Sequence, residues 1–434
     1  MGCHKTFTRR QFLAKSGVTA TAVVSLPYIV PSSAFGAAAP SNRITMGCIG
    51  VGSQGMSNLW GFLEKREARV LAVCDVDSRR LNRAKGFVDR GYQNSDCATY
   101  HDFRELIARD DIDAISIAVP DHWHSIPVVA AARAGKDMYA EKPLARTIHE
   151  GRVMVDAVRR YGCIWQTGSW QRSVRDFRYA CELVLNGRIG KVHTVEVGLP
   201  TGEGGGNVPV QSVPEGLDWD FWLGPAPWRP YQEFGRNGPH WDWRWIMDYS
   251  GGQLTDWAGH HIDIAHWGLG LDRTGPVEIE GTGVYPRDGV FNTPTQYKFT
   301  CKYATGLTMV VANARRQPKG MGTVWYGEKG WIHVDRGRFD AEPKSILGEV
   351  IGPNETRLYE SRDHIQNFLD CVKSRRETVA PIDIAHRSIS VALLGEIAML
   401  TGRKLKWDPE KEQFVNDAEA SRMLARPMRS PWVL

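Results

Sequence analysis

Short apolar runs separated by stretches of helical periodicity characterise the chain after residue 42. Such runs, almost free of polar residues, are typical of strands buried on both faces of a parallel sheet. They are Ile44–Ile49, Val70–Cys74, Ala114–Val119 and Asp137–Ala140. One of the helical patterns begins with the capping-box pair Thr147 and Glu150 and ends before Gly162. The alternation predicts an α/β fold with a doubly wound parallel sheet over residues 43–166.

A different pattern begins near residue 167. Glycine, proline and tryptophan become frequent, and apolar and polar residues alternate as in strands with one exposed face. Two strands and two helices are expected here: Val192–Val197, Leu307–Val311, Arg362–Lys373 and Asp383–Thr401. We therefore expect a second, α+β domain over 167–403 with a large open sheet, mixed or antiparallel. Residues 404–434 mix charge with proline and are expected to form a surface tail.

The amino terminus has the pattern of a twin-arginine export leader. Arg9 and Arg10 lie in a basic stretch, an apolar run covers Val18–Val30, and small residues follow. The run is too short and too polar to span a bilayer comfortably, although an uncleaved anchor helix remains an alternative. We expect residues 1–39 to be removed and the protein to be periplasmic or otherwise extracytoplasmic, without stable membrane insertion.

Charge and cysteine usage narrow the class further. The chain has a net charge of +5, and residues 1–39 hold four basic and no acidic residues, so the remainder has a net charge of only +1. No long basic run remains, so nucleic acid is not the expected partner. Seven cysteines follow residue 39 without a CxxC pair, which indicates buried apolar fillers rather than a disulfide framework.

A glycine-rich loop follows the first strand. Gly50 permits the tight turn, Gly52 lets the backbone approach a pyrophosphate, and Gly55 lets the next helix pack closely on the strand. The next helix is expected from Met56 to about Lys65, with its free N–H groups directed at the phosphates, and Ser53 and Gln54 of the loop are expected to contact the cofactor. Strand, loop, helix and strand in this order indicate a Rossmann dinucleotide-binding domain.

The second strand ends in Asp75, twenty residues after Gly55. A carboxylate at this position is expected to bind the adenosine ribose hydroxyls and to repel a 2′-phosphate, which favours NAD. Arg79 and Arg80 leave NADP as a second hypothesis. Because a nicotinamide nucleotide is scarce outside the cytoplasm and twin-arginine export moves folded chains, we expect a tightly bound cofactor that is recycled in place.

Two polar clusters follow later strands. Pro120 to His124 come directly after the third strand, and Glu141-Lys142-Pro143 follow the fourth. Ligands bind at the carboxyl ends of parallel strands, so we expect Pro120, His124, Glu141 and Lys142 near the cofactor. Glu-Lys-Pro also occurs as a simple turn, but its position at a strand end favours a function.

The densest candidate site is the segment from Asp256 to His266, which contains three histidines and two aspartates. On a helix, Asp256 and His260 lie one turn apart on the same face. A histidine can take a hydroxyl proton while hydride leaves the same carbon, with the aspartate orienting it and Lys142 assisting. A metal site is the rival hypothesis, but His260 and His261 are adjacent and do not face one way. No metal is therefore expected.

Tryptophan is concentrated just before this segment. Eight of the sixteen tryptophans lie between Trp219 and Trp267. Indole rings suit the apolar faces of sugars, and their N–H groups bind hydroxyls. The tryptophans of the segment 241–245 are the better candidates for a substrate pocket. Trp219, Trp222 and Trp228 are equally consistent with a place in the hydrophobic core. The expected substrate contacts are Lys142, Arg172, Trp243, Asp256, His260 and His261.

These motifs resemble those of the glucose–fructose oxidoreductase / inositol dehydrogenase (Gfo/Idh/MocA) family over nearly the whole chain after the leader. The matching residues are Gly50 to Gly55, Pro120-Asp121 with His124, Glu141-Lys142-Pro143, and the pair Asp256 and His260. The resemblance implies a Rossmann domain followed by an open-faced mixed sheet that often forms dimers or tetramers. It also implies that Lys142 lies by the nicotinamide and that Asp256 and His260 contact a reacting sugar hydroxyl.

Three functions are consistent with these residues. The leading hypothesis is an oxidoreductase that transfers hydride between a tightly held NAD, or NADP, and a sugar or polyol hydroxyl. The second is a glycosidase that uses bound NAD to oxidise a sugar transiently, so that the glycosidic bond is eliminated. The third is a sugar sensor without activity, against which the complete set of Lys142, Asp256 and His260 argues.

Overall fold

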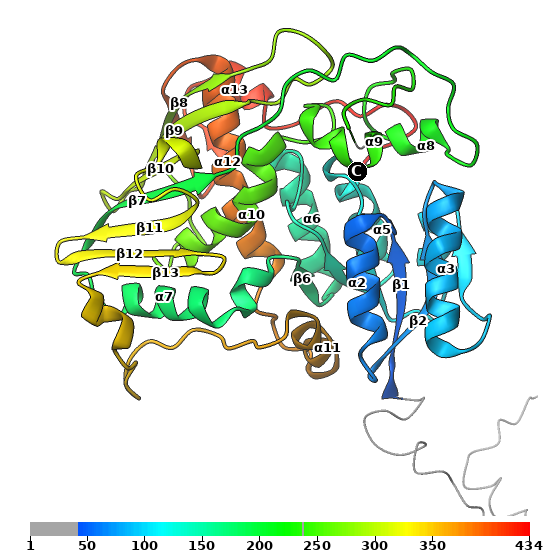
Figure 1. Cartoon of the computed structure of the whole chain (residues 1–434), viewed down its shortest axis with the longest axis horizontal. Helices are drawn as coiled ribbons and strands as arrows, with labels where there is room; N and C mark the ends of the chain where they lie inside the picture. Colours follow the sequence, from blue (N-terminus) through cyan, green and yellow to red (C-terminus); the bar gives the residue numbers. More distant parts are fainter. Residues whose placement is uncertain (1–41, 237) are drawn as a thin grey trace, which may run out of the picture. The chain divides into compact units, whose positions relative to one another are not determined.

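The computed structural model describes residues 42–236 and 238–434. The export leader predicted over residues 1–39 lies outside the described residues. The described chain contains two sheets, one of six strands and one of nine, both covered by helices (Figure 1).

The first sheet is the predicted parallel sheet, with strand order β3-β2-β1-β4-β5-β6. Its strands are β1 (Ile44–Ile49), β2 (Ala68–Cys74), β3 (Ala98–Tyr100), β4 (Ala114–Ile117), β5 (Asp137–Ala140) and β6 (Trp165–Thr167). The helices between and beside them are α2 (Ser53–Leu63), α3 (Ser78–Tyr92), α4 (Phe103–Ile107), α5 (Ser125–Arg133) and α6 (Ile148–Tyr161). The strand order reverses between β1 and β4, which is where a doubly wound sheet opens a ligand crevice.

Local signals set the ends of these elements. The capping box at the start of α6 is present: the Glu150 amide donates to the Thr147 hydroxyl (3.2 Å), and the Thr147 amide donates to the Glu150 carboxylate (3.1 Å). The helix ends at Tyr161, where Gly162 has a φ of +64°. The predicted bounds of this helix are thereby confirmed, because both ends depend on local chemistry.

The second sheet is mixed, as predicted. Its strand order is β13-β12-β11-β7-β10-β9-β8-β14-β15, in which β7 and β10 are parallel and all other neighbours antiparallel. The strands are β7 (Val192–Leu199), β8 (Glu278–Val284), β9 (Gln296–Lys302), β10 (Thr308–Asn313), β11 (Gly322–Gly327), β12 (Gly330–Asp335), β13 (Arg338–Glu342), β14 (Leu405–Asp408) and β15 (Gln413–Phe414). The helices of this half are α7 (Arg175–Leu185), α8 (Trp219–Leu223), α9 (Pro239–Asp242), α10 (Gly252–Trp267), α11 (His364–Ser374), α12 (Ile382–Thr401) and α13 (Ala418–Arg422).

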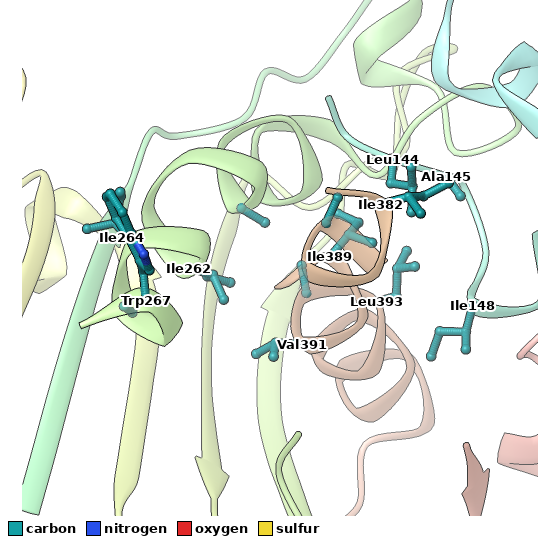
Figure 2. Packing of buried hydrophobic residues seen from close by; sticks show 14 of the residues in the cluster. Leu144, Ala145, Ile148, Ile262, Ile264, Trp267, Ile382, Ile389, Val391 and Leu393 are labelled. Atoms are coloured by element: carbon teal, nitrogen blue, oxygen red, sulfur yellow. The ribbon is translucent and has the colours of Figure 1, made fainter. Parts of the chain in front are cut away.

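Alternation along the strands separates an apolar face from a polar one. Val195, Met309 and Trp325 pair across β7, β10 and β11 and are completely buried. On this face lie α10 and α12, whose side chains, including Ile262 and Ile389, pack with each other (Figure 2). The continuous apolar layer holds α10 in place, and α10 carries the predicted Asp256–His260 pair.

The expected separation into two domains and a tail is wrong in two places. α11 follows the second sheet in sequence but packs on the first domain, where Phe368 lies against Phe62 and Tyr139. Residues 404–434 are not simply a surface tail, since β14 pairs with β8 and extends the large sheet. Both segments pack against elements that are distant in sequence, and local sequence patterns do not reveal such contacts.

The cysteines and the most apolar helix belong to the buried core. The seven cysteines of the described residues are free thiols, and six of them are buried. Among the described residues, α12 alone is long and apolar enough to cross a membrane, and 78% of its apolar window is buried inside the protein. It therefore has the burial of a core helix.

Candidate active site

A cleft lies at the carboxyl ends of β1, β2, β4 and β5. It contains about 1120 Å³ of space free of protein atoms, including its open mouth. Its lining from the first domain includes Gly50, Gly52, Ser53, Gln54, Asp75, Arg80, Phe103, Pro120, Asp121, Trp123, Glu141 and Lys142. Its lining from the second half includes Phe221, Trp222, His240, Trp243, Arg244 and Asp256. Most of the predicted cofactor residues are thus brought together in one cavity.

The glycine loop has the shape that the motif requires. Gly50 has a φ of +76°, and a Cβ at Gly55 would lie 1.9 Å from the Gly50 carbonyl oxygen, so a side chain fits at neither position. A Cβ at Gly52 would instead enter open space, with only a guanidinium nitrogen of Arg80 at 3.4 Å. α2 begins here without a side-chain cap, and its first residues, Ser53 and Gln54, line the cleft. This cradle fits a pyrophosphate.

Asp75 follows β2 directly and lies next to this loop. Its carboxylate accepts hydrogen bonds from the backbone amides of Val51 and Asp77, both at 2.9 Å. Burial raises the pKa of Asp75, while the two amides and the charge of Arg80 oppose the rise. The two amide bonds fix the orientation of the carboxylate at the position expected for a ribose ligand.

Glu141 connects the loop helix to the end of β5. Its Oε1 accepts hydrogen bonds from the side chains of Asn58 (3.0 Å) and Gln54 (3.2 Å). Burial raises the pKa of Glu141, and the nearby charge of Lys142 acts in the opposite direction. Glu141 thus positions Gln54 as well as lining the cleft.

Lys142 and Asp256 form the polar centre of the cleft. The Lys142 Nζ donates to Asp256 Oδ1 at 2.9 Å, and the Arg244 Nε lies 3.7 Å from the same oxygen. Burial alone would raise the pKa of Asp256, but Lys142 and Arg244 outweigh it and hold this pKa below its usual value. A carboxylate that stays ionised keeps the ammonium group in a fixed position.

His260 lies one helical turn beyond Asp256, as the spacing predicted. Burial, followed by the charges of Lys142 and Arg336, lowers the pKa of His260 well below its usual value. The imidazole is therefore neutral at pH 7 and is able to accept a proton. Its Nδ1 is buried without a hydrogen-bond partner among the described residues. His260 is not among the residues that line the cleft, whereas its neighbours Lys142 and Asp256 are.

The structure contradicts the expectation that His124 contacts the cofactor. The residue is buried, does not line the cleft, and directs Nδ1 at the Pro143 carbonyl (2.8 Å) and Nε2 at the Val119 carbonyl (2.9 Å). These contacts tie the ends of β4 and β5 together. Its neighbour Asp121 lines the cleft instead and accepts a hydrogen bond from the Ser250 hydroxyl at 2.7 Å.

Arg172 is also not a substrate contact in this structure. Its side chain is 1% exposed and pairs with Asp263 (2.7 Å) and Asp272 (2.9 Å), with its guanidinium over the ring of Trp267. The carboxylates that accept its hydrogen bonds thus belong to the protein itself and not to a substrate. Arg172 is therefore a buried structural cation that links η4 (Trp170–Ser173) to α10.

His261 turns away from the cleft, contrary to the expectation. Its ring is completely buried, stacks on Trp257 with centroids 5.5 Å apart, and places Nε2 3.4 Å from Asp335 on β12. Adjacent residues on a helix face different directions, and here His261 faces the large sheet while Asp256 faces the cleft. Burial lowers the pKa of His261 to about 3.

Of the three tryptophans in segment 241–245, only Trp243 lines the cleft. Trp241 is 43% exposed, and Trp245 is buried in a separate core where its indole N–H donates to Asp242. The Arg244 guanidinium lies over both Trp241 and Trp243, at 4.4 and 4.5 Å from the ring centroids. Among the alternative core residues, Trp219 and Trp222 are buried and stacked, whereas Trp228 is exposed.

The sequence did not reveal the wall formed by the Trp-rich insert (residues 216–236 and 238–249). The amide of Asp218 donates to Val76 (3.0 Å) and His240 Nε2 lies 3.1 Å from Asp77, so the insert contacts the loop after Asp75. Phe221 and Trp222 of α8 then line the cleft together with residues of the first domain. The sequence did not point to His240 or Arg244, because neither residue belongs to a recognisable motif or to a periodic pattern of a helix or strand.

The carboxyl-terminal strap (residues 423–434) packs behind this wall. Trp432 stacks on Phe221 with centroids 5.4 Å apart and meets the edge of Trp123 at 4.7 Å. Arg429 donates to the Gly224 carbonyl at 2.9 Å and pairs with Asp220. The strap thus joins α8 to the first domain at the cleft.

Comparison with known proteins assigns this fold and cleft to a class of oxidoreductases. The model of the oxidoreductase family NAD-binding Rossmann fold matches residues 44–169, and that of the oxidoreductase family C-terminal alpha/beta domain matches residues 185–434. The chain belongs to the Gfo/Idh/MocA oxidoreductase family, as its motifs predicted.

Similar proteins differ in their named activities. Residues of the chain are 34% identical over 167 positions to "Glycosyl hydrolase family 109 protein 2" of Shewanella sp. (strain ANA-3), covering 35% of this chain and 36% of that protein. They are 30% identical over 129 positions to "2,7-anhydro-N-acetylneuraminate hydratase" of Mediterraneibacter gnavus, covering 30% and 32%. The matched region thus spans about a third of the length of these relatives.

Solved structures match the fold over a longer region. The WlbA dehydrogenase of Bordetella pertussis, solved with NADH and UDP-GlcNAcA, aligns with a TM-score of 0.63 at 15% identity. The alignment covers 84% of this chain and 99% of that one. At this identity the similarity establishes the common fold.

Proposed function

We propose that this protein is an NAD-dependent oxidoreductase that acts on a hydroxyl group of a carbohydrate and retains its cofactor. The observation that carries the proposal is the contact between Lys142 and Asp256 inside the cleft, with the neutral His260 one turn away. The nicotinamide, when bound, supplies or accepts the hydride. The residues of this chain then have to manage one proton and the orientation of the hydroxyl.

The three side chains divide these tasks. His260, which is neutral and lies near Lys142, accepts the hydroxyl proton during oxidation and returns it during reduction. Lys142 donates a hydrogen bond to the same oxygen, which stabilises negative charge on it. Asp256 orients the Lys142 ammonium and balances its charge. This arrangement needs no metal ion for the proton transfer.

The preference for NAD rests on Asp75. Its carboxylate is fixed by two backbone amides in the cleft, where it would accept hydrogen bonds from ribose hydroxyls and repel a 2′-phosphate. Arg80 also lines the cleft, but it lies 3.8 Å from Asp77 and is thus engaged by an acid. Titration of cofactor-depleted protein with NAD and NADP tests the preference, and tighter binding of NADP would contradict it.

Retention of the cofactor is supported by the insert and the strap. The insert contacts the first domain next to Asp75, and the strap holds α8 over the cleft through Trp432 and Arg429. We propose that the cofactor is bound before export by the twin-arginine route and stays bound outside the cytoplasm. Detection of the protein in a periplasmic fraction with its cofactor, dependent on Arg9 and Arg10, tests the route.

The function is tested by single-turnover reduction of the cofactor already present. Purified protein is mixed with a panel of aldoses, polyols and uronates without added NAD, and the absorbance of reduced nicotinamide is followed. We expect reduction of the bound cofactor by at least one sugar class, and loss of reduction in Lys142→Ala with the cofactor still bound. A protein that carries the cofactor and is reduced by none would contradict the proposal.

A second candidate is an NAD-dependent glycosidase that oxidises, eliminates and returns the hydride. The names of two relatives, a glycosyl hydrolase and a hydratase, favour it, and such a cycle needs no external electron acceptor. Aryl glycosides given without added NAD distinguish the two functions. Repeated release of the aryl group supports elimination, whereas stoichiometric cofactor reduction without release supports the dehydrogenase.

We also propose that the protein forms a homodimer or homotetramer through the outer face of the large sheet. This face carries Glu196, Thr300 and Val310 in one row, opposite to the face of the buried Val195 and Met309, and the three side chains are only partly buried. Sedimentation velocity gives the mass of the assembly, and a strictly monomeric protein would contradict this proposal.

A further inference from the structure

We propose that Arg336 binds an anionic group of the substrate, so that the carbohydrate recognised here is a sugar acid with a carboxylate. The inference rests on the proposed function, because it assigns a substrate class to the same site. Four features carry it: the position of Arg336, the lack of an acceptor for its guanidinium, the two tryptophans that it shares with His260, and the chemistry of the group.

Arg336 is placed by the hairpin of β12 and β13. It is the first of two turn residues between Asp335 and Arg338, and the second, Gly337, has a φ of +74°. A two-residue turn holds the strands in fixed register and presents the side chain from a rigid support. Arg336 is exposed on this turn, so it remains accessible to a ligand.

Two tryptophans fix the guanidinium of Arg336. Its central carbon lies 4.5 Å from the ring centroids of both Trp170 and Trp257. Stacking on indole rings holds a guanidinium in place without using its N–H groups. Within the described residues, the guanidinium makes no hydrogen bond and no ion pair, so its donors are available to a ligand.

The nearest acids are engaged elsewhere. Asp335 accepts a hydrogen bond from the Arg336 backbone amide at 2.7 Å and lies 3.4 Å from the His261 ring. Asp256 is bonded to Lys142 and lies 3.7 Å from Arg244. The Arg336 guanidinium is therefore a second cation beside the reacting centre, and no carboxylate is paired with it. An anionic ligand would balance its positive charge.

The same two tryptophans connect Arg336 to the reacting centre. The His260 ring meets Trp257 edge-on at 5.5 Å and Trp170 at 6.3 Å. A sugar whose hydroxyl reaches His260 and Lys142 would thus extend toward Arg336. Trp170 is 39% exposed and provides an apolar surface for the ring of that sugar.

A carboxylate fits this guanidinium best. Arginine binds planar carboxylates through two parallel hydrogen bonds, a geometry that a lysine cannot reproduce. A sulfate ester presents similar acceptors with a tetrahedral geometry, and it is the alternative source of an anion. The experiment therefore compares a neutral sugar, its uronate and its sulfate ester.

Binding is measured by quenching of tryptophan fluorescence in cofactor-loaded protein, with galactose, galacturonate and galactose 6-sulfate and with the corresponding glucose series as probes. We expect a uronate to bind more tightly than its parent sugar. Arg336→Ala is expected to weaken uronate binding by about 10- to 100-fold and to leave binding of the neutral sugar unchanged. Arg336→Lys is expected to recover only part of the affinity.

Arg338→Ala is the matched control. Arg338 belongs to the same hairpin, and among the described residues its guanidinium donates only to the Lys319 carbonyl. The substitution is expected to leave both affinities unchanged. Equal binding of uronates and neutral sugars, equal weakening of both by Arg336→Ala, or tighter binding of the sulfate ester would overturn the proposal. Arg336-dependent uronate binding without any cofactor reduction would support the anion site and contradict the proposed function.

Discussion

At the scale of single residues, His260 and His261 are neighbours in sequence with different surroundings. Both are buried, but only His260 lies close to Lys142. Because burial and nearby cations lower its pKa, His260 stays neutral as the pH falls through 6.5. We therefore predict that kcat/KM keeps its value through this range and falls only at clearly lower pH. An acid limb centred at or above pH 6.5 in the pH–rate profile would contradict this role.

His260→Ala tests the same assignment by mutation. Loss of a general base typically lowers turnover by about 10²- to 10⁴-fold. The content of bound cofactor is expected to stay unchanged, because the cofactor contacts are assigned to the glycine loop, Asp75 and Lys142. His261→Gln is the neighbouring control, and it is expected to affect stability more than turnover because its ring faces the sheet.

Arg172 gives a prediction about stability rather than catalysis. Arg172→Met leaves the carboxylates of Asp263 and Asp272 without their cation in a buried site. Breaking a buried ion pair in this way typically costs about 3–5 kcal/mol of unfolding free energy. Denaturant titration measures the loss. An unchanged unfolding free energy together with a raised KM for the sugar would restore Arg172 as a substrate contact.

The role of a residue was predictable from the sequence where local backbone geometry or helical spacing determines it. The roles of Gly50 and Gly55 follow from backbone conformation and close packing, and Asp256 and His260 share a face through helical spacing. The positions of Arg172 and His261 were not predictable, because their partners come from other elements. The position of Arg336 was not predictable either, because the turn that carries it is far from His260 in sequence.

At the scale of elements, the insert forms one wall of the cleft and the strap packs against it. Trp432→Ala removes the ring that stacks on Phe221, so α8 is held less firmly over the cleft. We predict faster dissociation of the cofactor, measured as the fraction of chains that keep it after repeated gel filtration. Val433→Ala is the control, since this adjacent side chain is 78% exposed and is expected to change nothing. Equal retention in both variants would show that the strap has no part in closing the cleft.

Elements with strong local signals were predicted well and long-range ones were not. The strands β1 and β5 and the helix α6 have the predicted bounds, since apolar runs and caps define them. The short strand β14 was assigned to a tail, because its pairing with β8 depends on a distant partner. α8 was likewise hidden in a Trp-rich stretch whose packing on the strap no local pattern encodes.

At the scale of the whole molecule, buried neutral histidines make stability depend on pH. Burial lowers the pKa of His266 and of His364 to about 4 and that of His261 to about 3. Their unfolded values are near 6.5, so below that pH the unfolded state binds more protons. Each histidine then removes about 1.4 kcal/mol of stability per pH unit, until its folded pKa is reached.

Calorimetry from pH 7.5 to 5 tests this expectation. We predict that Tm is nearly constant above pH 6.5 and falls steadily below it. His266→Gln is expected to reduce the slope, whereas replacement of the exposed His193 is expected to leave it unchanged. A Tm that rises on acidification would contradict the burial of these rings as neutral groups.

We propose that this molecule carries a nicotinamide nucleotide permanently in the cleft bounded by Gly52, Asp75 and Lys142. The most direct measurement is mass spectrometry of what leaves the protein on denaturation, after purification without added cofactor and with quantification per chain. We predict close to one NAD for each chain. A protein that releases no nucleotide, and that binds neither NAD nor NADP in a subsequent titration, would contradict the account.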